Sequence, residues 1–593
     1  MLAIAAAVTI LTALPAAVAP GLPSDPSVPT SIAVEGPPLF PLAGIKPGLR
    51  GKGYTVFSSL DGPEPFEFVV LGVMKSALGP GEDIIIVRLI GEKIEKTGVI
   101  SGMSGSPAYI DGKLVGAVGY RFGQFTREPI AGITPIERMM TASARPSTSP
   151  ARTPPAGASS AFGDMSPIGT PLVMAGVAPH IVDAFRSELV KRGFGPVVSA
   201  GGGNGSSMGR ATRFFAGGPI AGVLVDGDMS MSAIGTVTWV KGDRFLAFGH
   251  PFMGLGAVDI VASNAEIITT VASEAGSWKM GQATAAVGRL TDDRLHAIAG
   301  DLGSPAGLIP MTVKVQMEGP RALADARPES TYRVAQHPTD TPMFCAVAVA
   351  NAISARVGAE LGGTLDVTVT AQLSTGEQVS APLRFADDTA GLEMPAAFAV
   401  LDLLSRLTDN DFQKVELKSV QVDARGRRAV ERARLVSVTP TRSLSPGGRS
   451  EVVIRTQPFQ GPVKEQRVSF SLPRGVPEGG YSLVIAGADG AARVEREAGM
   501  VPIPSAYRDV LTGIATAPPP GSLSVYLVRE ESSPRLQGIA TTGLPPSLSE
   551  LTAGSGGLYG AGSVDARAVR LARISGSGVL VGEAAAKVQV QEP

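Results

Sequence analysis

The sequence predicts a mainly β protein made of several domains. A length of 593 residues is several times that of an average domain. Hydrophobic residues make up 44% of the chain and charged residues 18%, which is enough apolar material to bury substantial cores. Gly and Pro together account for about a fifth of the residues and separate short runs rich in Val, Ile and Thr. This pattern is typical of short strands joined by tight turns rather than of long helices.

Residues 1–21 are expected to be a signal peptide for export. The run "MLAIAAAVTILTALPAAVAPG" is uncharged, apolar and ends in small residues, and Ala17-Val18-Ala19 fits the A-x-A cleavage rule. A basic segment at the start is missing, and Pro20 would hinder cleavage at that point. An uncleaved membrane anchor of marginal length is the alternative. We therefore expect a periplasmic, cell-envelope or secreted protein with no integral membrane span beyond this leader.

Residues 38–145 are expected to form a β-rich domain. Strand-like runs such as "GYTVFSS", "PFEFVVLGVM" and "DIIIVRLIG" are separated by Gly and Pro. Asp111-Gly112 lies between two apolar runs and predicts a tight β-hairpin.

Residues 146–214 are expected to contain a linker and a helix. The Pro-, Ala- and Ser-rich stretch up to residue 162 predicts a linker or a long surface loop. In "PHIVDAFRSELVKRGFG", Ile181, Phe185 and Leu189 recur at helical spacing and predict an amphipathic helix.

The remainder of the chain divides into three further regions. Residues 215–320 are again β-rich, and residues 321–412 mix strands with helical stretches. In residues 413–593, runs such as "KVELKSVQVDA", "SEVVIRTQPF" and "EQRVSFSLP" alternate at regular spacing and predict an immunoglobulin-like β-sandwich. The single cysteine, Cys345, excludes internal disulfides and lies in an apolar segment where a core thiol is expected.

Composition argues against several function classes. The net charge is −1 and no basic stripe is present, so nucleic acid is not expected as a partner. The four histidines and one cysteine are too scattered to form a metal ligand set, and no metal or other cofactor is expected. The run "GGGNGSS" at 201–207 lacks the GK[ST] of a phosphate loop and is interpreted as a flexible loop.

The segment "SGMSGSPAYIDGKLVGAVGY", residues 101–120, carries the strongest chemical signal. A serine becomes a nucleophile when a rigid turn presents its hydroxyl to a base. Gly102 can adopt backbone angles closed to other residues, so that its N–H and that of Ser104 converge as an oxyanion hole. On this geometry Ser104 is the nucleophile and Ser106 a small residue of the site wall. An ordinary Gly/Ser turn between two strands explains the same spacing.

The base must come from four histidines. His250 in "FLAFGHPFMGLG" ends an apolar strand and is the candidate general base, with a structural histidine as the alternative. His180 starts the predicted helix and is expected to be solvated. His296 and His337 are expected to lie on the surface or in loops.

Two blocks of the sequence resemble a known peptidase family. The run "GVISGMSGSPAYIDGKLVGAV" resembles the nucleophile region of the SpoIVB sporulation peptidases, which are chymotrypsin-like serine proteases, and "LAFGH" resembles their histidine motif. Residues 38–320 are similar to secreted bacterial proteins with a SpoIVB peptidase domain, which also carry "PIAGITPI" and "GHPF". The resemblance implies two chymotrypsin-like β-barrels and a protein or peptide substrate. It assigns Ser104 as nucleophile, His250 as general base, and the amides of Gly102 and Ser104 as oxyanion hole.

The chain departs from this family in three ways. Ser104 precedes His250, whereas the histidine half comes first in the sporulation peptidases; a circular permutation could preserve the site, because triads depend on geometry rather than chain order. No PDZ-like domain is evident, so the partner-sensing role is not transferred. The family's acid falls near Ile90–Glu92, where Glu92 is not a clean match. Asp259, nine residues after His250, is the other candidate for orienting the histidine, and a dyad or an inactive site are the remaining alternatives.

Two functional hypotheses follow from the sequence. The first is an exported serine endopeptidase in which Ser104 and His250 meet between two barrels. The second is a catalytically inactive protein of the cell envelope that keeps the peptidase fold for binding or as a scaffold. The lack of a clear acid and the large C-terminal half favour the second. The expected role of that C-terminal region is binding, spacing or stabilising.

Overall fold

The prediction of a mainly β protein is confirmed by the computed structural model, in which 53% of residues are in strands and 17% in helices. The structure describes residues 36–123, 126–142, 165–200, 213–254, 256–303, 306–318, 328–337, 339–357, 362–389, 391–440, 443–529, 533–536, 539–540, 563–564, 567–576 and 578–591. The expected signal peptide, the Pro-rich part of the expected linker and the glycine run at 201–207 lie outside these residues.

The first domain is a closed six-stranded antiparallel β-barrel. Its strands pair in the order β4-β1-β2-β3-β6-β5, and β4 returns to β5. Two short helices, α1 (Glu92–Thr97) and α2 (Ile136–Ala142), lie outside the ring. At the predicted hairpin, Asp111 and Gly112 have φ of 50° and 73°, the values of a type I′ turn. The strands are β1 (Arg50–Val56), β2 (Pro63–Met74), β3 (Ile84–Ile90), β4 (Pro107–Ile110), β5 (Lys113–Phe122) and β6 (Ile130–Pro135).

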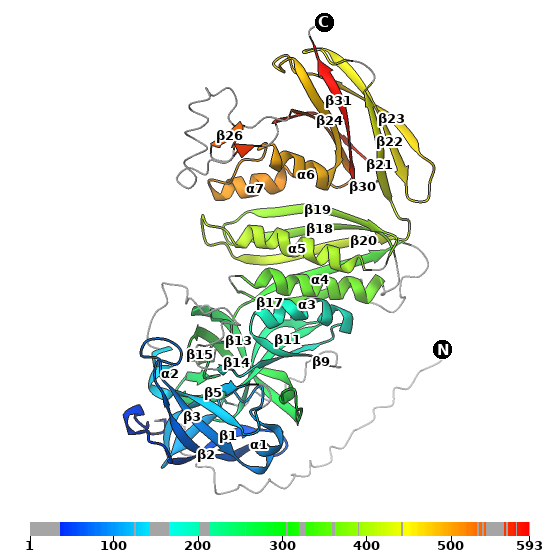
Figure 1. Ribbon diagram of the computed structural model, residues 1–593. Helices are drawn as coiled ribbons and strands as arrows, with labels where there is room; N and C mark the ends of the chain where they lie inside the picture. Colours follow the sequence, from blue (N-terminus) through cyan, green and yellow to red (C-terminus); the bar gives the residue numbers. More distant parts are fainter. Residues whose placement is uncertain are drawn as a thin grey trace, which may run out of the picture.

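A second set of six strands also pairs in a ring. The order is β10-β13-β14-β15-β12-β11, and β10 pairs with β11. If the six strands of each ring are numbered 1 to 6 along the chain, both rings close in the same cyclic order, 1-2-3-6-5-4. The strands are β10 (Pro219–Gly227), β11 (Ser230–Lys241), β12 (Arg244–Ala247), β13 (Gly256–Val271), β14 (Trp278–Arg294) and β15 (Ala297–Leu302). The two rings form the lower part of the molecule in Figure 1.

A short segment connects the two rings. Strand β7 (Met165–Pro167) pairs with β5 of the first barrel, and β8 (Thr170–Ala175) pairs with β11 of the second. Helix α3 (Pro179–Lys191) follows and confirms the predicted amphipathic helix, because Ile181, Phe185 and Leu189 are all buried. Strand β9 (Phe194–Ala200) then pairs in parallel with β8.

A mixed layer of strands and helices covers the second ring (Figure 1). Helix α4 is buried on all sides, and burial raises the pKa of the Cys345 thiol to about 12, so Cys345 is the core thiol that the sequence predicts. β20 lies between β16, to which it is parallel, and β18, so residues 417–427 belong to this layer rather than to the C-terminal region in which we expected them. The elements are β16 (Leu308–Met317), β17 (Glu329–Ala335), α4 (Thr341–Val357), β18 (Gly363–Leu373), β19 (Gln378–Asp387), α5 (Glu393–Thr408) and β20 (Leu417–Arg427).

The C-terminal region contains two four-stranded sheets that share one apolar core. One sheet consists of β21 (Arg432–Pro440), β22 (Arg449–Pro458), β23 (Lys464–Ser471) and β30 (Val579–Val581). The other consists of β24 (Gly479–Gly487), β25 (Ser522–Arg529), β29 (Arg567–Ser575) and β31 (Glu583–Val590). Also described are α6 (Ala488–Glu497), α7 (Tyr507–Ala515), β26 (Ser533–Leu536), β27 (Ile539–Ala540) and β28 (Ser563–Val564). Of the helices in the described part of the chain, none has the length and apolar character needed to cross a membrane.

The two rings approach each other so closely that only glycine fits at the contact. A Cβ on Gly119 of β5 would overlap the carbonyl oxygen of Gly249, which also accepts a hydrogen bond of 2.5 Å from Thr134 Oγ1. A Cβ on Gly105 would overlap the carbonyl oxygen of Thr236 in β11. The absence of side chains at both glycines therefore lets backbone pack on backbone.

We predict that Gly119→Ala lowers the free energy of unfolding by about 1–3 kcal/mol, since the added methyl forces the two rings apart. Thermal unfolding measures the effect. Gly72→Ala is the matched control, because Gly72 also lies in a strand but has open space where its Cβ would be. Equal melting temperatures for the two variants would show that the contact does not hold the rings together.

Candidate active site

The serine and histidine motifs are attached to the same strand, β11. The Thr236 N–H donates to the Ser104 carbonyl at 2.9 Å, and the Thr236 carbonyl accepts from the Phe248 N–H at 3.2 Å. Ser104 lies in the loop that leads into β4, and Phe248 lies two residues before His250 in the loop after β12. Two segments far apart in the sequence are thus fixed on either side of one residue.

The hydroxyl of Ser104 is buried and free. Ser104 has no exposed surface, and its Oγ has no hydrogen-bond partner among the described residues. The neighbouring hydroxyl differs, because Ser106 Oγ donates to the Met103 carbonyl at 2.6 Å and so holds the turn. Of the two serines, only Ser104 therefore retains an uncommitted oxygen.

His250 has an orientation suited to a base. Its Nδ1 lies 2.7 Å from the Pro251 carbonyl, which can only accept, so Nδ1 carries the proton and Nε2 the lone pair. Burial lowers the pKa of His250 to about 4, against a smaller opposing effect of the Pro251 and Ile168 carbonyls. The imidazole is therefore neutral at pH 7. Nε2 is buried and has no hydrogen-bond partner in the described part of the chain.

Ser104 Oγ and Nε2 of His250 are therefore two unpartnered polar atoms in one interface, although they are not hydrogen-bonded to each other. Leaving such a group unpaired costs about 1–3 kcal/mol, so a native structure rarely keeps one without a reason. Proton transfer between them requires a heavy-atom separation of about 2.6–3.2 Å, so the two loops have to move closer before the reaction.

Neither expected acid contacts the histidine. Glu92 lies on α1 with 84% of its side chain exposed and forms an ion pair of 2.7 Å with Lys96. Asp259 of β13 is about half exposed, with Arg289 Nη1 3.9 Å from its Oδ1. Because the Pro251 carbonyl occupies Nδ1 of His250, Asp259 does not have the orienting role that we expected. The Pro251 carbonyl occupies the position at His250 Nδ1 that a carboxylate occupies in a catalytic triad.

The expected oxyanion hole is half occupied. Gly102 has a φ of +92°, which confirms the need for glycine at this position. Its N–H, however, donates to the Gly169 carbonyl at 3.2 Å. The Ser104 N–H has no partner among the backbone groups that the structure describes. Only one of the two expected donors is free.

Asp293 is a site residue that the sequence did not reveal. Its buried carboxylate accepts hydrogen bonds of 2.6–2.7 Å from the N–H groups of Phe252, Met253 and Gly254. These residues directly follow His250-Pro251, so Asp293 fixes the histidine loop. In "TDDRL" the two adjacent aspartates point to opposite faces of β14, and the sequence does not say which face is buried.

Lys279 is a second residue missed in the sequence. It is fully buried, and its Nζ donates to Thr55 Oγ1 at 2.7 Å and to Thr236 Oγ1 at 3.1 Å. Thr236 Oγ1 donates in turn to the Gly102 carbonyl at 3.0 Å. Burial lowers the pKa of Lys279 to about 7. The chain of hydrogen bonds connects both rings and holds the peptide unit next to Ser104.

The remaining histidines lie elsewhere: His296 is in the turn between β14 and β15 and His337 in the loop before α4, as expected for loop residues, although neither is exposed. His180 is 43% exposed, as expected, and lies 3.6 Å from Glu393. His296 is only 11% exposed, because the turn after β14 packs against the first barrel and places Nε2 2.8 Å from Glu82. His337 is fully buried at the start of α4, where its Nδ1 accepts from the Asp340 N–H at 3.0 Å.

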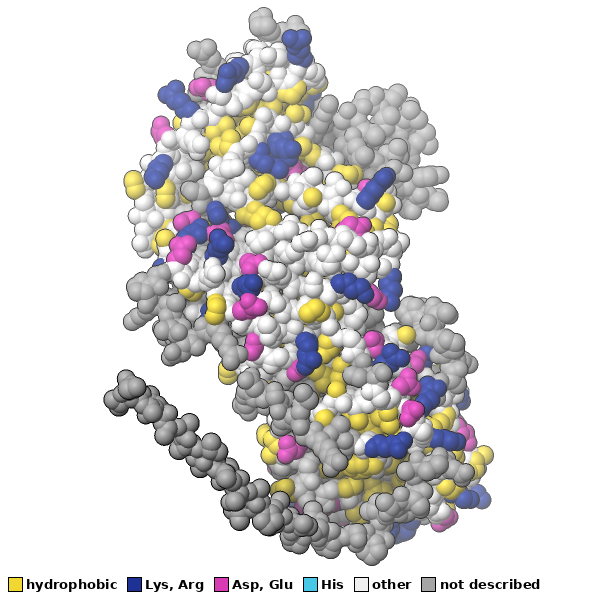
Figure 2. Space-filling model, turned by 180° about the vertical axis from the view of Figure 1, so that it is seen from behind, with side chains coloured by type: hydrophobic (Ala, Val, Ile, Leu, Met, Phe, Trp, Pro, Cys, Tyr) yellow, Lys and Arg dark blue, Asp and Glu magenta, His cyan; other side chains and the backbone are white. Residues whose placement is uncertain are grey.

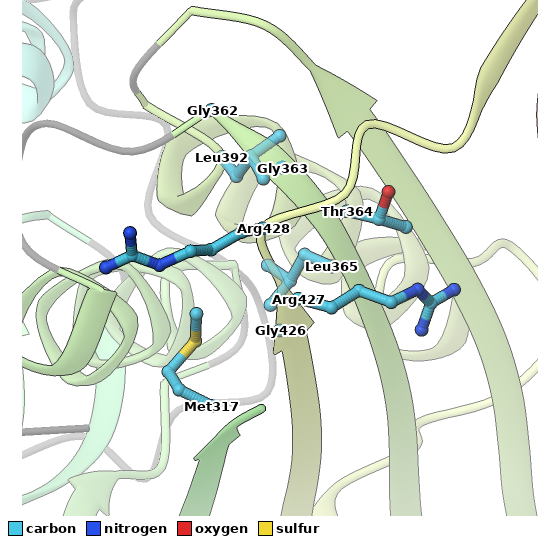
Figure 3. A pocket seen from close by; sticks show the side chains of 9 residues that line it. All are labelled: Met317, Gly362, Gly363, Thr364, Leu365, Leu392, Gly426, Arg427 and Arg428. Carbon is cyan, nitrogen blue, oxygen red and sulfur yellow. The ribbon is translucent and has the colours of Figure 1, made fainter. Parts of the chain in front are cut away.

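In the part of the chain that the structure describes, no metal site competes with this site as the functional centre. Within the described ranges, no group of three or more His, Cys, Asp and Glu side chains could hold a metal ion. A small pocket lies in the mixed layer (Figure 3), where Arg427 and Arg428 extend in opposite directions. Arg427 is already paired with Asp366 and Glu431 at 2.7 Å. Nothing in that pocket points to a ligand.

Comparison of the chain with protein-family models, with curated proteins and with solved structures found no match.

We predict that Asp293→Asn lowers the free energy of unfolding by about 1–3 kcal/mol, because one amide oxygen cannot replace a carboxylate that accepts three N–H groups. Chemical denaturation measures the effect. Asp292→Asn is the control, since it removes only an ion pair of 3.0 Å with Arg294. An effect of Asp292→Asn as large as that of Asp293→Asn would contradict the role given to Asp293.

Proposed function

We propose that the protein is an exported serine endopeptidase with two chymotrypsin-like β-barrels in permuted order, Ser104 as nucleophile and His250 as general base. The observation that carries the proposal is the pair of buried, unpartnered atoms, Ser104 Oγ and His250 Nε2, on two loops held by β11. Two rings of equal strand order with the site between them support the two-barrel architecture. Export rests on the apolar N-terminal run.

The chemistry follows from the protonation state of His250. Nε2 accepts the proton of Ser104 Oγ as the oxygen attacks the peptide carbonyl, and later donates this proton to the leaving amine. The Ser104 N–H stabilises the oxyanion, and the Gly102 N–H joins it once the Gly169 carbonyl moves away. Water then hydrolyses the acyl-enzyme with the same base. The Pro251 carbonyl keeps Nδ1 protonated throughout.

We assign an immunoglobulin-like fold and a binding or spacing role to the C-terminal region, whose two sheets enclose one core. The proposed partner of the site is a protein or peptide substrate. The proposal includes no nucleic acid partner, because Lys and Arg side chains are interspersed with Asp and Glu side chains on the face shown in Figure 2.

A second candidate is an inactive protein that keeps the peptidase fold for binding. Three observations favour it: His250 has no carboxylate partner, the Gly102 N–H is occupied, and Ser104 has no exposed surface. Reaction of Ser104 with an acylating or phosphonylating reagent separates the two candidates.

We predict that a fluorophosphonate probe labels the wild-type protein during prolonged incubation and does not label Ser104→Ala. Labelling is expected to be slow because Ser104 is buried. Ser106→Ala is the matched control, since its hydroxyl is committed to the Met103 carbonyl and labelling should persist. Equal labelling of wild type and Ser104→Ala would refute the assignment, and a folded wild type that never reacts would favour the inactive candidate.

We predict that the labelling rate stays nearly constant from pH 8 to pH 5.5. The folded-state pKa of His250 is about 4, so the imidazole remains the unprotonated base well below the ordinary value of about 6.5. The rate should fall only as the pH approaches 4. A half-maximal rate near pH 6.5 would show that a solvated histidine controls the reaction.

A further inference from the structure

The segment Met165–Gly169 lies along an edge of the first barrel and leads to the candidate site. In β7, Met165 is paired with Phe122 and Pro167 with Tyr120, antiparallel to β5. The Ile168 N–H continues this pairing by donating to the Gly119 carbonyl at 2.9 Å. Met165 and Ile168 are both buried, so the segment is anchored at its two ends.

At the site, the main chain of this segment contacts the catalytic groups of the proposed peptidase. The Gly169 carbonyl accepts the N–H of Gly102, one of the two oxyanion donors, at 3.2 Å. The Ile168 carbonyl raises the pKa of His250, although burial lowers this pKa by more. Just beyond, Pro171 packs beside Gly102, with its Cγ 3.3 Å from where a Cβ of Gly102 would be. A stretch of extended peptide thus reaches both the base and the oxyanion donor.

We propose that the edge of β5, the Gly102 amide and His250 together form a binding site for an extended peptide main chain, and that Met165–Gly169 is its resident occupant. The inference rests on the proposed function and adds the regulation of its site by a segment of the same chain. An incoming substrate adds as a strand to β5 and presents a carbonyl to the Gly102 N–H. Because the edge of β5 and the Gly102 N–H are already engaged by this segment, the enzyme is latent until the segment moves away.

The main-chain hydrogen bonds of this binding site explain why its ligand is a peptide. Its contacts with the occupant are main-chain hydrogen bonds, which is how extended peptides bind by strand addition. The occupant belongs to the same chain, so its effective concentration is high and a free substrate competes poorly with it. Ser104, two residues beyond the Gly102 that the segment contacts, has no exposed surface.

The decisive experiment locks the occupant in place. In the double variant Phe122→Cys/Met165→Cys, the two positions face each other across β5 and β7. Ile168–Gly119 is a hydrogen-bonded pair, and hydrogen-bonded and non-hydrogen-bonded pairs alternate along the two strands, so Met165–Phe122 is a non-hydrogen-bonded pair. The short Cα separation of such a pair suits a disulfide. Cys345 is fully buried and does not compete. We expect the reduced form to react with a fluorophosphonate probe about tenfold faster than the oxidised form, with no effect of reductant on the wild type.

A second variant loosens the occupant instead. A methyl group on Gly169 would overlap the Gly195 carbonyl oxygen and lie 3.0 Å from Ser101 Oγ, so Gly169→Ala should react about tenfold faster than the wild type. Pro167→Ala is the matched control, because Pro167 is exposed in the same segment and should react like the wild type. Thermal unfolding shows whether each variant is folded, and adding Ser104→Ala should abolish labelling in all of them.

The outcomes distinguish this inference from the proposed function. If the oxidised and reduced double variants react at the same rate, and Gly169→Ala reacts like the wild type, the occupant does not block the site although Ser104 remains the nucleophile. If no folded form reacts, including Gly169→Ala and the reduced double variant, the proposed function fails and this inference fails with it.

Discussion

The site depends on the close approach of two β-rings through a single residue, Thr236. Its N–H binds the Ser104 carbonyl and its own carbonyl binds the Phe248 N–H, so one peptide unit of β11 sets the positions of both motif loops. Its hydroxyl donates to the Gly102 carbonyl and accepts from Lys279. Gly105 and Gly119 permit this approach, because a side chain at either position would overlap backbone of the second ring. Removing the contact would separate the proposed nucleophile from its base.

Several groups around this contact lower the stability of the fold. Lys279 is fully buried and interacts with two threonine hydroxyls, and the resulting desolvation moves its pKa down to about 7. Ser104 Oγ and His250 Nε2 are buried and have no hydrogen-bond partner among the described residues. Each feature lowers the stability of the fold, and an apolar interface would be more stable. Their concentration around one peptide unit is typical of a functional site.

Local patterns in the sequence predicted the parts of this structure that depend on neighbouring residues. The Asp111-Gly112 turn and helix α3 each follow from a short motif whose backbone preference is local. Ser104 and His250 were singled out by the residues beside them, and the structure places their loops together.

The parts that the sequence did not predict depend on distant contacts. The choice of Asp293 over Asp292 as the buried carboxylate depends on which face of β14 meets the histidine loop. The sequence placed 417–427 with the C-terminal strands, but its strand pairs in parallel with β16, more than a hundred residues earlier. His337 is a loop residue, as the sequence predicts, but it is buried where the loop packs against the start of α4, with its N–H donating to Thr341 Oγ1 and its ring near Phe344. The carbonyl partner of His250 could not be predicted either, because any residue can supply a backbone carbonyl.

The backbone carbonyl at His250 has a consequence for the rate of the proposed reaction. In a triad, the carboxylate both selects the tautomer of the imidazole and stabilises the imidazolium that forms during attack. The Pro251 carbonyl performs the first task, because it can only accept the Nδ1 proton. It performs the second weakly, since a neutral dipole stabilises a cation less than a full negative charge does. Burial, which lowers the pKa of His250 to about 4, disfavours the imidazolium further. The histidine is therefore oriented for proton transfer but poorly compensated once charged, which points to a slow peptidase rather than a general digestive enzyme.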